Sequence, residues 1–176
     1  FLPIPEDILD IDINFDKNNK PSISIGLGRD LKIDDLVNNR FVVKQILKDN
    51  KIAKDFVKNL LKGTEYQVIE NSKKRGVDML LYKDSQHIAN IECERKIVWV
   101  NQEFPYENVQ IPERKTKYAV LEEPTVFVML NKDQTAYLAI PQQNLLSSPI
   151  KEIPNKYNFK GEMFYQVPKE QVYFND

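Results

Sequence analysis

Two carboxylates, Asp78 and Glu92, stand at a spacing that suggests metal chemistry. They lie in two apolar runs separated by the turn-forming residues Lys83-Asp84-Ser85-Gln86, so the two runs are expected to form an antiparallel hairpin. If Lys83 and His87 flank a three-residue turn, Asp78 lies directly opposite Glu92, with the two Cβ atoms about 4.5–5.5 Å apart. Two carboxylates at that distance repel each other, and a hard divalent cation such as Mg²⁺ removes the repulsion by taking both as oxygen ligands. A solvated strand face is the simpler alternative, but a surface carboxylate is unexpected inside the apolar run that holds Asp78.

The strand that carries Glu92 places further ionisable side chains beside it. Because side chains along a strand alternate between the two faces, Glu94 and Lys96 follow Glu92 on one face. Cys93 and His87 point to the opposite face, so we expect Cys93 in the core and His87 at the surface or in packing. Three ionisable groups therefore line one edge of the predicted site.

At these residues the chain resembles the PD-(D/E)XK nuclease superfamily, the fold of many restriction endonucleases and resolvases. The order of motifs is similar to that of the archaeal Holliday-junction resolvases: a helix acid, a strand, the basic turn Lys73-Lys74-Arg75, the pair Val77-Asp78, a hairpin and the strand Ile91-Glu92-Cys93-Glu94. The resemblance covers roughly residues 50 to 140. It implies hydrolysis of phosphodiester bonds in DNA by Mg²⁺, for which Mn²⁺ would substitute, with Asp78 and Glu92 as the metal ligands.

The chain departs from the family pattern at two places. Gly76-Val77 stands where the name-giving proline would be, and Glu94 replaces the usual lysine. By resemblance to active Glu-x-Glu members, Glu94 would act as general base or metal ligand, the carbonyl of Cys93 would be an extra oxygen ligand, and Lys96 or a neighbour would supply positive charge. A shifted register in which Glu94-Arg95-Lys96 restores an acid-x-Lys motif stays open as the second interpretation.

Two more acids and a set of basic residues could support this site. Asp55 matches the helix acid of the resolvases and Glu70 ends the first predicted strand, so either could reach the site edge as a metal ligand; a solvated acid is the alternative for both. Candidate phosphate-binding residues precede the Asp78 strand or lie early in the predicted helix at 112–123, although ordinary surface charge is the alternative for each: Lys73, Lys74, Arg75, Arg114, Lys115 and Lys117. The aromatic residues Trp99, Phe104 and Tyr106 could stack on bases or pack against the core.

The elements that must position these residues follow from the hydrophobic periodicity, which changes from about four to two along the chain. Two helices are predicted between residues 34 and 62, separated at Lys48-Asp49-Asn50, and a third helix at 112–123 follows a loop at 97–110. Strands are predicted at 66–69, 77–82, 87–96, 125–130, 135–140 and near 162–167. This order predicts an α/β fold with a mixed sheet, and the resemblance implies a restriction-endonuclease-like αβββαβ core flanked by helices.

The ends of the chain are predicted to lie outside that core. Alternation in residues 10–15 and 22–25 predicts a β-hairpin within an N-terminal β arm at 1–30. The nuclease-like core is assigned to 31–141 and a C-terminal extension to 142–176.

Composition narrows the class of protein. The chain has 176 residues, with 25 Lys+Arg against 26 Asp+Glu, which excludes a strongly basic coat protein but permits one basic face. No apolar run approaches the roughly 20 residues that span a bilayer, and a single cysteine excludes a disulfide framework. We expect a cytoplasmic protein of a cell or virus that binds DNA and no membrane, and a homodimer would suit the cutting of two strands.

Two other classes of function remain open on the sequence. One is a non-catalytic nucleic-acid-binding module that keeps the fold, with Glu94 marking decay of the site. The other is a structural or interaction protein of a virus, with the terminal segments as arms. The presence of both Asp78 and Glu92 favours the enzyme, because a decayed site has little reason to keep either.

Overall fold

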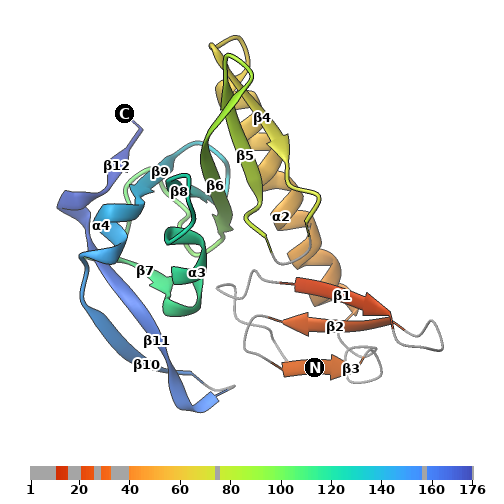
Figure 1. Ribbon diagram of the computed structural model, residues 1–176. Helices are drawn as coiled ribbons and strands as arrows, with labels where there is room; N and C mark the ends of the chain where they lie inside the picture. The colour runs from red at the N-terminus through yellow and green to blue at the C-terminus, as the bar shows by residue number, and fades with distance from the viewer. Residues whose placement is uncertain are drawn as a thin grey trace.

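A computed structural model describes residues 11–15, 21–25, 29–32, 40–73, 76–155 and 158–175 (Figure 1). Lys74 and Arg75, two of the predicted phosphate-binding residues, lie outside these ranges. No helix in the described part of the chain is both long enough and apolar enough to cross a membrane.

A six-stranded mixed sheet forms the centre of the structure. Its strands are ordered β12-β9-β8-β6-β5-β4, and β6 and β8 run parallel whereas all other neighbours are antiparallel. An α/β fold with a mixed sheet is therefore confirmed. The strands are β4 (Tyr66–Glu70), β5 (Met79–Lys83), β6 (Gln86–Lys96), β8 (Thr125–Asn131), β9 (Tyr137–Pro141) and β12 (Tyr173–Phe174).

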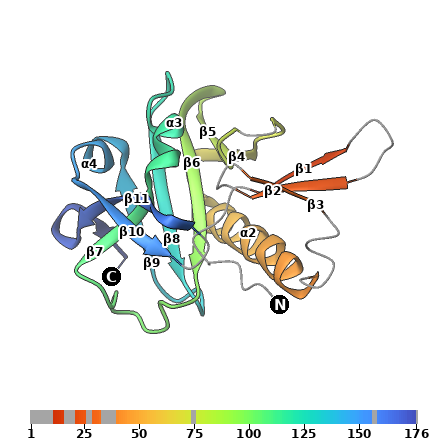
Figure 2. The same cartoon turned by 90° about the horizontal axis from the view of Figure 1, so that it is seen from below.

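One long helix, α2 (Arg40–Leu61), lies against one face of this sheet (Figure 2). Its apolar stripe, which includes Ala53 and Val57, packs on a cluster with Met79, Ile91 and Cys93. The predicted break at 48–50 is wrong, because α2 is continuous through these residues. Residues 48–50 contain neither glycine nor proline, so nothing in the backbone forces a break.

The polar residues at 48–50 are accommodated inside the helix because Asp49 has a partner on the sheet. Its carboxylate lies 2.7 Å from Nη1 of Arg95 on β6, and Asp49 is almost buried. Arg95 also donates from Nε and Nη2 to the carbonyl oxygen of Lys132, at 2.9 and 2.6 Å. This set of contacts fixes α2 to the end of β6 and to the turn between β8 and β9.

The connection from β6 to β8 crosses the other face of the sheet and differs from the prediction. A helix was predicted at 112–123, but the chain forms β7 (Asn108–Pro112), a 3₁₀ turn η2 (Glu113–Lys115) and a short helix α3 (Thr116–Ala119). The strand β7 pairs with β11 (Asn158–Pro168), with Gln110 opposite Gln166. A partner so distant in sequence leaves no local signal, and this tertiary pairing decides the structure.

The residues after Pro141 add to both sheets. They form α4 (Gln142–Leu146), β10 (Ile150–Asn155), β11, the 3₁₀ turn η3 (Lys169–Gln171) and β12. The second sheet has the order β10-β11-β7, so the strand predicted near 162–167 is confirmed within β11. Leu145 and Val167 lie in the same buried cluster as Trp99, Phe127 and Leu138.

Near the N-terminus, β1 (Ile11–Phe15), β2 (Pro21–Ile25) and β3 (Arg29–Lys32) form a three-stranded antiparallel sheet. Ile11 lies opposite Ile25, which is the pairing that the predicted hairpin requires. The strand β3 was not predicted.

Candidate functional site

The β5–β6 hairpin sets the register of the site. Its turn has two residues, Asp84 and Ser85, both with positive φ (50° and 64°), where three were predicted. A bulge then adds one residue to β6, since Leu81 pairs with Ala89 while Tyr82 pairs with His87. The extra residue in β6 compensates for the shorter turn. The strands therefore pair in the predicted register from Leu81 back to Met79.

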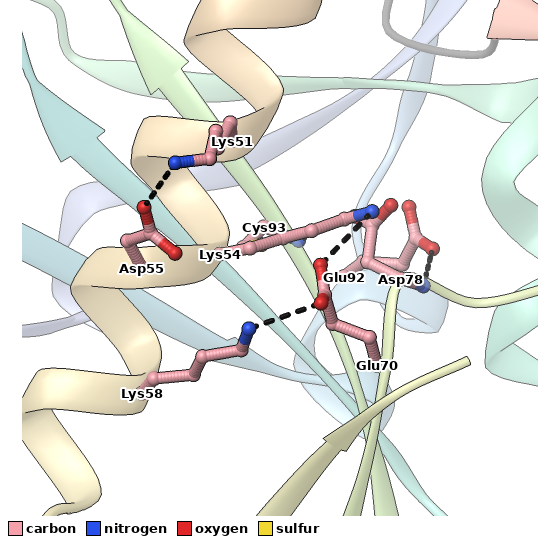
Figure 3. Close-up of polar contacts among 8 residues, drawn as sticks. All are labelled: Lys51, Lys54, Asp55, Lys58, Glu70, Asp78, Glu92 and Cys93. Carbon is pink, nitrogen blue, oxygen red and sulfur yellow. Dashed lines mark hydrogen bonds and ion pairs between the residues drawn. The ribbon is translucent and has the colours of Figure 1, made fainter. Parts of the chain in front are cut away.

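Asp78 and Glu92 lie side by side, as predicted, where β5 begins (Figure 3). The backbone N–H of Asp78 donates to Oε1 of Glu92 at 2.9 Å, and the backbone N–H of Cys93 donates to Oδ2 of Asp78 at 3.0 Å. Each carboxylate is therefore held by the backbone of the opposite strand. Hydrogen bonds of this kind stabilise the ionised form of a carboxyl group and fix its direction.

A lysine on the face of the sheet opposite α2 forms an ion pair with Glu92. Nζ of Lys115, in η2, lies 2.8 Å from Oε2 of Glu92, and Lys115 and Glu92 are only 4% and 3% exposed. The repulsion expected between the two carboxylates is thus reduced by a cation that the chain itself provides.

Lys115 was predicted as one of the basic residues that flank the site, but its direct contact with Glu92 was not predicted. The signal that could have found it is its spacing from Tyr118 and Ala119, three and four residues later. These two side chains are buried, so a residue three or four positions before them shares their inward face.

Glu94 follows Glu92 on the same face of β6 and is also buried, with 8% of its surface exposed. A narrow pocket lies between β6 and the crossover, with Glu92, Glu94 and Lys115 among apolar residues such as Phe127 and Met129. The volume of this pocket, about 10 Å³, is close to what one water molecule needs. Burying charged groups costs free energy that apolar residues would not cost, so this acidic strand is better explained by function than by stability.

The donors present fit a hard divalent cation. Among the residues that the structure describes, no three His, Cys, Asp or Glu side chains gather as a complete metal cage. Mg²⁺ does not require one, because it is commonly held by one or two carboxylates and completes its shell with water and phosphate oxygens. Asp78 and Glu92 supply those two carboxylates.

The two other predicted acids have partners on α2. Asp55 forms an ion pair with Lys51 at 3.5 Å, and its side chain is 49% exposed. Glu70 lies 3.0 Å from Nζ of Lys58 and 3.8 Å from Nζ of Lys54 (Figure 3). Neither Asp55 nor Glu70 joins Asp78 and Glu92 in the contacts that define the site.

The predicted basic residues do not form one cluster in the part of the chain that the structure describes. Arg114 forms an ion pair with Glu162 of β11 at 3.1 Å, and Nζ of the exposed Lys117 lies 4.7 Å above the ring of Tyr118. Lys73 is exposed before Asp78, and Lys96 is half-buried as the last residue of β6.

The histidine and the loop aromatics are mostly packing residues. His87 stacks on Tyr82 with 5.3 Å between ring centres, and Trp99 and Phe104 are buried edge to face at 5.3 Å. Tyr106 is 49% exposed and packs its ring edge against Phe104. Packing, the alternative to base stacking, is confirmed for Trp99 and Phe104.

Cys93 lies on the α2 face of the sheet, as predicted for a core residue. Burial, followed by the charges of Asp78 and Glu92, raises the pKa of its thiol well above the ordinary value, while Lys54 and Lys115 act in the opposite direction. A raised pKa leaves little of the reactive thiolate at neutral pH.

We expect Cys93 to react with a thiol reagent such as DTNB at least about tenfold more slowly in the folded protein than in urea. The chain has one cysteine, so absorbance after mixing reports this residue alone. Equal rates in the two conditions would contradict the buried position of Cys93.

Comparisons of the chain with protein-family models, with curated proteins and with solved structures find no match.

Proposed function

We propose that this protein is a Mg²⁺-dependent endonuclease that hydrolyses phosphodiester bonds in DNA. The observation that carries the proposal is the contact between Asp78 and Glu92 on neighbouring strands, with the buried ammonium of Lys115 on Glu92. Adjacent carboxylates beside a cationic side chain are suited to a metal ion and to the negative charge that develops on a phosphate.

The order of elements supports the same proposal. A helix (α2) precedes three antiparallel strands (β4, β5, β6), and a crossover then leads to a strand (β8) parallel to the third. Apart from the crossover, this order is similar to the αβββαβ order of the restriction-endonuclease-like core that the sequence resemblance implies. The crossover contains β7, a 3₁₀ turn and the four-residue helix α3, where the resemblance implies one longer helix.

In the proposed reaction, Asp78 and Glu92 hold the cation and Glu94 deprotonates or orients the attacking water. When bound, the metal would lower the pKa of a coordinated water and neutralise charge on the phosphate. Lys115 supplies the positive charge that the family draws from the lysine replaced by Glu94. Because it already contacts Glu92, Lys115 can hold that carboxylate in place and present its ammonium to the phosphate.

The direct test is cleavage of supercoiled plasmid, single-stranded DNA and branched DNA by the purified protein with Mg²⁺ and with Mn²⁺. The proposal predicts cleavage of at least one substrate. An inactive parent protein in both metals would favour the alternative of a nucleic-acid-binding or viral interaction module, in which the Lys115–Glu92 pair is structural.

The same assay tests the register of the site. Glu94→Ala is expected to lower the cleavage rate on the order of 10²-fold, as loss of a positioned general base does. Lys96→Ala, at the more open end of β6, is expected to cost less than about tenfold. Full activity of Glu94→Ala together with an inactive Lys96→Ala would instead establish the shifted Glu94-Arg95-Lys96 register.

A further inference from the structure

Lysines form a row along one face of α2. At 3.6 residues per turn, these lysines lie within an arc of about 120° around the helix axis. Between the first and the last lysine, Asp55 is the one residue of another type within that arc. The row consists of Lys48, Lys51, Lys54, Lys58 and Lys62, the last of which directly follows the helix. We call these five residues the lysine face.

The lysine face concentrates positive charge on a chain that is otherwise acidic. The helix has six basic and two acidic residues, a net charge of +4, while the whole chain has −1, so the remainder has −5. The side chain of Lys51 is 80% exposed and that of Lys58 is 39% exposed, and Lys48 and Lys62 are exposed as well. A surface built only for solubility intersperses both signs of charge.

The acids near the lysine face balance only part of its charge. Asp55 accompanies Lys51, and the single carboxylate of Glu70 serves both Lys54 and Lys58. Two ammonium groups on one half-exposed carboxylate leave an excess positive charge beside β4.

The lysine face leads to the acid site. Figure 3 shows the side chain of Lys54 extended past Cys93 toward Asp78 and Glu92. Its Nζ lies 3.8 Å from Oε1 of Glu70, and Glu70 pairs with Met79, the residue that follows Asp78. A phosphate chain lying along α2 would therefore be led toward Asp78, which is half-buried where β5 begins.

We propose that the lysine face binds the phosphate backbone of a DNA strand and guides it to Asp78 and Glu92, an inference that rests on the proposed nuclease function. From Lys48 to Lys62 the face is about 21 Å long, the length of about six base pairs of duplex. Helices that lie on membranes bury their apolar face in the lipid, and the apolar face of α2 is packed on the sheet. A polyanion of regular charge spacing fits this face better than a lipid surface does.

The test compares two double variants with the same change in net charge. Lys51→Gln with Lys62→Gln alters the lysine face, and Lys132→Gln with Lys151→Gln alters exposed lysines elsewhere. Binding of a fluorescent DNA duplex is measured by anisotropy in EDTA, where no cleavage occurs, at several salt concentrations. The first variant should reduce the slope of log K against log salt by about two, because each lost phosphate contact removes about 0.9. The second should leave the slope within about 0.5 of the parent.

Equal effects of the two variants would show that only net charge matters and would overturn the inference, as would no effect of either. Binding to vesicles of anionic lipid in place of DNA would overturn the choice of partner. These outcomes are separable from failure of the nuclease proposal, because metal binding at Asp78 and cleavage of plasmid are measured independently.

Discussion

Asp78→Asn is expected to lower the rate of Mg²⁺-dependent plasmid cleavage on the order of 10³-fold, equivalent to about 4 kcal/mol of transition-state stabilisation. Asparagine has the same shape but no charge, so the cation loses one of its two carboxylates. The amide oxygen can still accept the hydrogen bond from the N–H of Cys93, so the metal-free fold should keep its stability. The rate is measured as conversion of supercoiled to nicked and linear plasmid.

The matched control is Glu65→Gln, another exchange of carboxylate for amide. Glu65 lies just before β4, forms an ion pair with Lys83 at 3.5 Å, and has a side chain that is 61% exposed. This variant should cleave within about twofold of the parent rate, because an exposed ion pair contributes little. If Asp78→Asn is as active as Glu65→Gln, Asp78 has no role in the reaction.

Lys115→Met is expected to destabilise the metal-free protein by about 3–5 kcal/mol, because it leaves Glu92 buried without its counter-ion. Methionine occupies a similar volume, so the loss comes from charge and not from a cavity. Urea unfolding in EDTA, followed by circular dichroism, measures the free energy of unfolding.

The double variant Lys115→Met with Glu92→Gln separates the ion pair from packing. Once Glu92 is neutral, removal of the lysine no longer strands a charge, so the double variant should recover more than half of the lost stability. The amide oxygen at position 92 can still accept from the N–H of Asp78. A double variant whose destabilisation equals the sum of the two single effects would show that the pair contributes nothing through its charges.

The sheet and the acid pair could be predicted because local patterns specify them. The alternation around Asp78 and Glu92 fixes which face each side chain takes, and the register was predicted correctly although the turn was not. A β-bulge compensates the shorter turn, and no pattern in the residues around Ile88 distinguishes that bulge from a longer loop.

The missed features depend on partners far away in the sequence. The strand β7 exists because β11 pairs with it, and the crossover therefore reaches Glu92 through a 3₁₀ turn instead of a long helix. The contact of Lys115 with Glu92 was missed for the same reason, since it spans 23 residues. Asp49, inside α2, has its partner in Arg95, 46 residues later. Short-range periodicity cannot contain these contacts.

The central claim is that Asp78 and Glu92 bind a divalent cation, and calorimetric titration of Mn²⁺ into the metal-free parent, Asp78→Asn and Glu65→Gln tests it most directly. We expect saturable binding to the parent and to Glu65→Gln, and binding at least about tenfold weaker in Asp78→Asn. Equal binding by all three proteins, or no binding by the parent, would contradict it.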